Sequence, residues 1–243
     1  MSFQYFYSPD PWEIAPLVLN REESFHCARV CRCREGDTIG LTSGDGRLAQ
    51  ATIIAISREP VVILKIQENT IRHYPPPKPL RLFISPLQAP DRMEWLVEKA
   101  TELGATEITW ILCHRTVRNT VRMERLQRVA LAALKQSARP YLPRIVPPQP
   151  FTQLHEPAGS SWIATCHDQL IPPRLSLSQL AVTPPTNIFI GPEGDFTEEE
   201  VQLALQKGAI PVSLGPYRLR SETAALKALS LISSILEKEP NLG

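Results

Sequence analysis

Long apolar runs are missing from this sequence of 243 residues. No stretch reaches the roughly 20 consecutive apolar residues that a helix needs to cross a bilayer. The first residues, MSFQYFYSPDPWE, also lack the basic segment and apolar core of a secretory signal peptide. These absences argue against a membrane protein or a secreted protein, so we expect a cytoplasmic protein with no membrane partner.

Cysteine is scarce, with five residues in the chain. Cys27, Cys31 and Cys33 cluster beside His26, but the spacing Cys-x3-Cys-x-Cys matches no common zinc site. A metal site that used His26 would need a second spaced pair of ligands, which the sequence does not offer. We therefore predict no metal ion, and reduced thiols packed in or near a strand.

The two common phosphate-binding motifs, G-x-x-x-x-G-K-[ST] and G-x-G-x-x-G, are absent as well. Two Gly-Pro turns stand instead between an apolar run and a helix start, in IGPEGDFTEEE from Ile190 and LGPYRLRSETAAL from Leu214. Glu193 and Asp195 would repel a pyrophosphate. A ligand with hydroxyl groups and a positive charge fits better, such as a ribose with a sulfonium or ammonium group. Ile190, Leu214 and Leu219 could flank a flat base; the alternative is that each Gly-Pro pair only makes a turn.

The net charge of +1 hides a local excess of basic residues. Residues 114–144 contain eight arginines or lysines and a single acid, Glu124. A second cluster lies nearer the amino terminus, at Arg29, Arg32 and Arg34. Such an imbalance favours a polyanionic partner, and we interpret it as a nucleic-acid surface. The alternative is a solvated helix face, because arginines recur at helical spacing from 115 to 125.

The pattern of the chain changes at HYPPPKP, residues 73–79, whose four prolines cannot lie inside a sheet and stiffen a connector. Residues 1–72 carry strand-like runs at 38–42, 47–54 and 60–66, and an Asp-Gly hairpin signal joins the first two, which favours a small β-barrel. Residues 80–243 alternate strand and helix patterns, which predicts α/β structure with a parallel sheet. The expected strands are 80–84, 107–112, 161–165, 187–190 and 211–214, and the expected helices are 91–103, 122–137, 197–207 and 222–237.

Two of the expected helices carry start signals. Thr197 with Glu200 forms a capping-box pattern, and Asp91 with Glu94 forms a similar one. The first of them places residues 191–196 in a loop that leaves a buried strand, where parallel sheets bind ligands.

Four motifs together resemble one enzyme family. IGPEGDFT, LGPYRLRSETAA, EWLVEKATELGATEI and ALKQSARPYLPRI are similar to the RsmE family of SPOUT-class methyltransferases, which methylate N3 of a uridine in 16S small-subunit ribosomal RNA. The segment HCARVCRCREGDTI resembles that family's amino-terminal, PUA-like RNA-binding barrel. The resemblance implies a carboxy-terminal trefoil knot, S-adenosylmethionine as cofactor and a homodimer whose active site is completed across the interface. The substrate would be ribosomal RNA or the assembled small subunit.

The resemblance also assigns roles to residues. It implies a cofactor site made of Thr165, Ile190, Gly191, Pro192, Glu193, Gly194, Leu214, Gly215 and Leu219. The candidate RNA-binding residues are Arg29, Arg32, Arg34, Arg115, Arg118 and Arg139. Two positions depart from the family pattern: Asp195 stands where a third glycine is usual, and Tyr217 stands where arginine is common.

Methyl transfer to uracil N3 needs alignment of the reactants and stabilisation of the anion that develops on the ring. Arg220, in the loop before the last helix, is the first candidate for that cation. Glu222, at the helix start, could orient Arg220 or assist proton transfer. The alternative roles are structural: Glu222 would complement the helix dipole, and Arg220 would pair with it.

Two other functions compete with the methyltransferase. A non-catalytic RNA-binding assembly factor would keep the basic residues but would not bind S-adenosylmethionine. A nucleotide-dependent enzyme of ordinary doubly wound fold would need a phosphate loop, which the sequence lacks.

Overall fold

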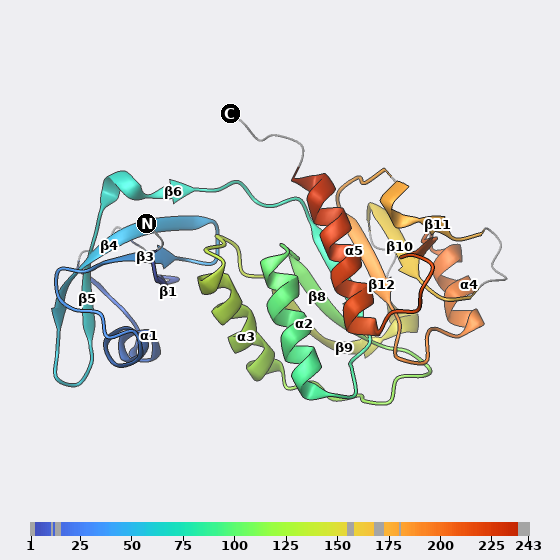
Figure 1. Cartoon of the computed structure of the whole chain (residues 1–243), viewed down its shortest axis with the longest axis horizontal. Coiled ribbons are helices and arrows are strands. Elements are labelled where there is room, and N and C mark those ends of the chain that lie inside the picture. The colour runs from blue at the N-terminus through green and yellow to red at the C-terminus, as the bar shows by residue number, and fades with distance from the viewer. Residues whose placement is uncertain are drawn as a thin grey trace. The chain divides into compact units, whose positions relative to one another are not determined.

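The computed structural model describes residues 3–10, 12, 16–154, 158–167, 173–179 and 181–237 (Figure 1). The chain forms two compact units. Unit 1 comprises Met1–Pro77 and Leu131–Leu142, and unit 2 comprises Lys78–Ala130 and Pro143–Gly243. The residues of the two Gly-Pro loops all belong to unit 2.

Unit 1 is built on a mostly antiparallel sheet in the order β1-β3-β4-β5-β2, with β6 also paired to β4. The predicted hairpin is confirmed, because β3 and β4 pair in antiparallel register on either side of residues 43–46. The elements are β1 Tyr5–Tyr7, β2 Leu17–Val18, α1 Arg21–Phe25, the π-helical turn η1 His26–Val30, β3 Thr38–Thr42, β4 Arg47–Ile56, β5 Val62–Ile66, the 3-10 turn η2 Glu68–Thr70 and β6 Arg72–His73.

The cysteine cluster lies on a helical segment and on the turn that follows it, not in a strand. Cys27 belongs to η1 and is fully buried in the core of unit 1 among strand residues such as Ile39 and Leu64. Cys31 and Cys33 pack against that core. Burial raises the pKa of the Cys27 thiol, so it stays protonated at neutral pH. Within the described ranges, no group of three or more His, Cys, Asp or Glu side chains is arranged to hold a metal ion.

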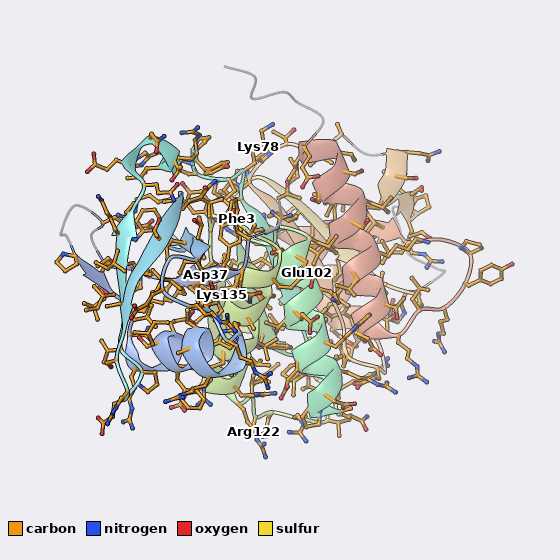
Figure 2. The ribbon with its side chains drawn as sticks, turned by 60° about the vertical axis from the view of Figure 1, so that its left-hand side comes forward. Phe3, Asp37, Lys78, Glu102, Arg122 and Lys135 are labelled. Carbon is orange, nitrogen blue, oxygen red and sulfur yellow. The ribbon has the colours of Figure 1, made fainter. Side chains whose placement is uncertain are left out.

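The last residues of helix α3, Met123–Gln136, belong to unit 1. Lys135, labelled in Figure 2, forms an ion pair with Glu23 at 2.6 Å. The other carboxylate oxygen of Glu23 accepts a hydrogen bond from Tyr7 N at 3.1 Å. Glu23 is buried, so these donors compensate a charge that would otherwise be costly to remove from water.

Unit 2 contains a seven-stranded sheet in the order β11-β13-β10-β12-β7-β8-β9, and every pair in it is parallel, as predicted. Its elements are β7 Leu80–Ile84, α2 Pro90–Glu102, β8 Glu107–Leu112, the first residues of α3, β9 Arg144–Pro150, the 3-10 turn η3 Phe151–Gln153, β10 Ser160–Ala164, β11 Leu175–Ser176, the 3-10 turn η4 Leu177–Gln179, β12 Thr186–Ile190, α4 Glu198–Gln206, β13 Ile210–Ser213 and α5 Ser221–Leu236.

Helices cover this sheet. Helices α2 and α5 lie side by side across it, and α5 contacts β7 and β12 (Figure 1). Helix α4 packs its buried Val201 into the cluster that contains Phe83, Ile163 and Phe189. Side chains alternate between the faces of a strand, so these three residues mark one face of the sheet. None of the helices in the described ranges is long and apolar enough to span a bilayer.

One expected helix cap is confirmed and the other is wrong. Thr197 and Glu200 form the capping box at the start of α4. Helix α2 begins one residue earlier than expected, at Pro90, and Ala89 is its N-cap without a side-chain bond. Proline at the first helical position presets φ and lacks an N–H that would be unpaired there, so Asp91 is not needed as a cap.

Candidate functional site

The carboxyl ends of three neighbouring strands meet at one edge of the parallel sheet. In the central strand β10, Ala164 pairs with Ile190 of β12 on one side and with Val212 of β13 on the other. The chain leaves these strands as the β10 loop, residues 165–167, the β12 loop, residues 191–196, and the β13 loop, residues 214–220. Ligands bind at such edges because backbone groups are free there.

The three loops enclose a cavity of about 320 Å³. Apolar side chains, including Ile190, Val212, Leu214 and Leu219, form part of its wall. The charged residues that line it are Glu193, Asp195, Arg174, Arg218 and Arg220. An apolar wall with a few charged groups of both signs suits a ligand that carries a flat apolar part and a charged part.

Most of the residues expected at a cofactor site line this cavity. They are Thr165, Ile190, Gly191, Pro192, Glu193, Leu214, Gly215 and Leu219. Gly194 is not among the lining residues; it is exposed, and its carbonyl accepts a hydrogen bond from Arg115 Nη1 at 2.8 Å. Cys166, Ser213 and Ser221 also line the wall, and none of them was predicted as a site residue.

The β12 loop folds through a tight turn. Asp195 N donates to Pro192 O at 2.9 Å, and Asp195 has a positive φ of 65°. Gly191 leaves little room for a side chain, because a Cβ atom there would lie 3.0 Å from the backbone nitrogen of Phe196. Phe196 is fully buried, so the loop is anchored in the core before the capping box of α4 begins.

The carboxylate of Asp195 joins the β12 loop to the β10 loop. Its Oδ2 accepts hydrogen bonds from Cys166 N at 2.7 Å and from Thr165 Oγ1 at 3.2 Å. Its Oδ1 accepts from Phe196 N at 2.8 Å. Asp195, which the resemblance marks as a departure, therefore bridges two walls of the cavity.

Glu193 ties the β12 loop to the segment that follows β7. Its Oε1 accepts a hydrogen bond from Gln88 N at 3.0 Å, while Arg118 Nε donates to Gln88 O at 3.1 Å. Arg115 donates to the carbonyls of Gly194 and Phe196. Two of the arginines expected to bind RNA thus donate to carbonyl groups of the β12 loop and of the segment that follows β7.

The β13 loop depends on a glycine for its backbone. Gly215 has a φ of 128°, which side chains of L-residues rarely allow. Ser213 Oγ contacts both the N–H and the carbonyl of Gly215 at 3.2 Å. Tyr217, the second departure from the family pattern, is 84% exposed at the rim of the cavity.

The two expected catalytic residues lie in different surroundings. Arg220 lines the cavity, is exposed and occupies the N-cap position of α5. Glu222 is only 7% exposed and is not part of the cavity wall. Its carboxylate pairs with Arg92 of α2 at 3.4 Å, rather than with Arg220. Arg92 could not be predicted as the partner of Glu222, because the pair joins helices that are distant in the chain.

The remaining basic candidates all belong to unit 1. Arg29, Arg32 and Arg34 are exposed in unit 1, and Arg29 Nη2 donates to Arg58 O at 2.9 Å. Arg139 also belongs to unit 1, where its carbonyl accepts a hydrogen bond from Thr42 Oγ1. The alternative interpretation of Arg115 and Arg118 as a helix face is wrong, because both precede α3.

Comparisons with known proteins identify the family. Models described as "RNA methyltransferase domain" and "RNA methyltransferase PUA domain" match residues 75–233 and 19–66. The chain is 32% identical to Ribosomal RNA small subunit methyltransferase E of Bacillus subtilis over 242 residues, which cover 91% of each chain. It is 31% identical to the Synechocystis protein of the same name over 245 residues, which cover 98% of this chain and 79% of that one.

A solved structure agrees with the sequence relatives. The crystal structure of a Ribosomal RNA small subunit methyltransferase E from Neisseria gonorrhoeae bound to S-adenosyl methionine matches with a TM-score of 0.82 and 25% identity. The match covers 96% of this chain and 98% of that one. The chain therefore belongs to the ribosomal RNA small subunit methyltransferase E family of RNA methyltransferases.

Proposed function

We propose that this protein transfers a methyl group from S-adenosylmethionine to N3 of a uridine in 16S small-subunit ribosomal RNA. The observation that carries the proposal is the cavity between the β10, β12 and β13 loops, in a chain of this family. The gonococcal relative is bound to S-adenosyl methionine, which supports the choice of cofactor.

The chemistry of the cavity wall fits that cofactor. Ile190, Leu214 and Leu219 would flank the flat base, and the carboxylates of Glu193 and Asp195 favour a cation. The volume of about 320 Å³ is within the usual range for a small-molecule site. When bound, S-adenosylmethionine supplies an electrophilic methyl group on a positively charged sulfur.

Arg220 is the cation that we propose for the chemical step. Loss of the N3 proton to solvent would place negative charge on the uracil ring, and N3 would then take the methyl group that the cofactor supplies, leaving a neutral thioether. The exposed guanidinium of Arg220 lines the cavity, where it can stabilise that charge. We propose that Glu222 acts indirectly, because its pairing with Arg92 fixes the start of the helix that carries Arg220.

We propose a division of labour along the chain. Residues 1–72 form the PUA-like RNA-binding domain, residues 73–79 a linker, and residues 80–243 the SPOUT methyltransferase domain. The family model for a PUA domain at residues 19–66 supports the first assignment. The proposed RNA contacts in unit 1 are Arg139 and the exposed Arg29, Arg32 and Arg34, and those in unit 2 are Arg115 and Arg118.

We further propose that the carboxy-terminal part contains a trefoil knot and that the enzyme acts in the cytoplasm as a homodimer. Membership of the family supports these assignments. The convergence of the β10, β12 and β13 loops on one cavity is compatible with a knotted site.

Two measurements test the function. Calorimetric titration of the purified protein with S-adenosylmethionine should give saturable binding with one site per chain. Incubation with labelled cofactor and small subunits that lack the modification should then place one methyl group on uridine N3, located by mass spectrometry of nuclease fragments. Parallel reactions with free 16S ribosomal RNA distinguish the two substrates. Absence of cofactor binding would favour the RNA-binding assembly factor instead.

A further inference from the structure

Asp195 occupies a backbone conformation that usually belongs to glycine. Its φ of 65° lies in the left-handed region, which costs most side chains free energy and which aspartate and asparagine tolerate better than others. A glycine would satisfy the turn from Pro192 at lower steric cost. The side chain of Asp195 therefore calls for an explanation beyond the turn itself.

The carboxylate of Asp195 accepts hydrogen bonds from two loops, which accounts for a side chain at this position. Cys166 N and Thr165 Oγ1, both in the β10 loop, donate to one oxygen of Asp195, and Phe196 N of its own loop donates to the other. Glycine could accept none of these bonds through a side chain. Because Thr165, Cys166 and Asp195 all line the cavity, the bridge sets the separation of two of its walls.

The carbonyl groups around Asp195 are held as well. Arg115 Nη1 donates to Gly194 O at 2.8 Å and contacts Phe196 O at 3.3 Å. The ring Nε2 of His167, in the β10 loop, lies 2.9 Å from Phe196 O. The β12 loop is thus fixed through its carbonyls and through the Asp195 carboxylate, and three of these hydrogen bonds come from the β10 loop.

We propose that Asp195 is a positioning residue that preorganises the cofactor cavity by bridging the β10 and β12 loops. This inference rests on the proposed function, because it concerns the same site. Asp195 acts through Thr165 and Cys166, so its removal weakens cofactor binding and leaves the chemical step intact. A preformed site binds more tightly because fewer loop conformations are lost on binding.

Two variants separate the carboxylate from the backbone. Asp195→Gly keeps the positive φ and removes the carboxylate, whereas Asp195→Asn keeps the shape of the side chain but replaces one acceptor oxygen by an NH2 donor. Glu198→Gln is the matched control, because Glu198 is an exposed acid at the start of α4 outside the cavity. Each protein is titrated with S-adenosylmethionine, melted, and followed by amide hydrogen exchange at Cys166.

We expect both Asp195 variants to bind S-adenosylmethionine about tenfold more weakly than the unaltered protein, through loss of preorganisation. The Cys166 amide should exchange faster in both without cofactor. The value of kcat at saturating cofactor should stay within about twofold, while KM for the cofactor rises. The Glu198→Gln protein should match the unaltered protein in all three measurements.

The possible failures are distinguishable. Unchanged cofactor affinity and unchanged Cys166 exchange in a folded Asp195→Gly protein would overturn the inference. A fall in melting temperature without a change in affinity would do the same, because it would make Asp195 a stabilising residue only. If the unaltered protein does not bind S-adenosylmethionine, the proposed function fails; faster Cys166 exchange in the variants would then still show the bridge between the loops.

Discussion

The β12 and β13 loops both leave a buried strand through Gly-Pro, but they are built in opposite ways. Three other segments hold the β12 loop: the side chains of Arg115 and His167 bind its carbonyls, and the backbone N–H of Gln88 donates to Glu193. The hydrogen bonds that the described residues give the β13 loop are local, at Ser213 and at the helix start. The same dipeptide thus begins two different kinds of loop. The β12 loop is a rigid frame, held by other segments of the chain, whereas the β13 loop is exposed and presents its side chains to the cavity.

The aromatic residues of the two loops show the same contrast. Phe196 of the β12 loop is fully buried and its ring lies 5.4 Å from that of Phe151, whereas Tyr217 of the β13 loop is 84% exposed. If the β12 loop is the frame, its variants should affect stability and cofactor affinity. If the β13 loop presents groups to the substrate, its variants should affect the reaction more than the fold.

The largest effect on stability should come from the frame. Phe196→Ala empties a buried site in the core beside Gly191, which should cost about 3–5 kcal/mol of the free energy of unfolding. Urea denaturation followed by circular dichroism measures the change. A loss below about 1 kcal/mol would show that the β12 loop is not anchored in the core.

The largest effect on the reaction should come from the β13 loop. Arg220→Ala should lower the single-turnover rate of methyl transfer by about a hundredfold, because the cation that stabilises the uracil anion is lost. Arg220→Lys keeps the charge without the planar fork and should fall between the two. Cofactor affinity and melting temperature should change little, since Glu222 is paired with Arg92. A near-normal rate for the alanine variant would remove Arg220 from the chemistry.

Backbone strain offers a third test. Gly215→Val places a β-branched residue at a φ of 128°, so the β13 loop must change shape and cofactor binding should weaken by about tenfold or more. Gly208→Val is the matched control: its φ is 82°, but it follows α4 and does not line the cavity. Calorimetric titration should show weaker binding for Gly215→Val alone, while both variants melt at lower temperature.

Variants of Arg115 test whether a residue that holds the β12 loop also binds RNA. Arg115→Ala removes the bonds to the carbonyls of Gly194 and Phe196, which should cost about 1 kcal/mol of stability and weaken cofactor binding a few-fold. Arg115→Lys should not restore cofactor affinity, because the ammonium of the shorter lysine side chain does not reach the position of Nη1, which makes both bonds. If lysine restores RNA binding but not cofactor binding, Arg115 has both roles. Full restoration of both by lysine would argue against a loop clamp.

The smallest effect on stability should be at Tyr217. Because the ring is mostly exposed, Tyr217→Ala should change the free energy of unfolding by less than about 0.5 kcal/mol. Thermal melts of this variant beside Phe196→Ala compare the two loops directly. A marked loss of stability would mean that the β13 loop packs more tightly than its exposure indicates.

Local signals in the sequence predicted much of unit 2. The strands from 80 to 84 and 107 to 112 were found at their observed bounds, because each is a compact apolar run. Strand β9 was missed, since Pro147, Pro148 and Pro150 argue against a strand. Proline is tolerated there because β9 lies at the edge of the sheet. The N–H groups on its outer side have no neighbouring strand to bond, so a proline on that side costs no hydrogen bond.

The sequence predicted which loops form the site, but not the side-chain contacts that join those loops to other elements. The Gly-Pro turns marked two of the loops that line the cavity, because strand, turn and helix start are adjacent in the chain. The contacts of Asp195 with Cys166 and of Glu222 with Arg92 join separate elements. No periodicity or spacing encodes such pairs, so the expected partner of Glu222 was Arg220 and the role of Asp195 remained open.

The prolines of β9 have a consequence for how the protein behaves at high concentration. An open sheet edge can recruit a strand from another molecule and start aggregation. Among the described strands, β9 and β11 form the two edges of the parallel sheet. Strand β11 is only two residues long, and the prolines of β9 withhold N–H groups that a foreign strand would need. Both edges are therefore poor templates for fibrillar growth while newly made chains are crowded together.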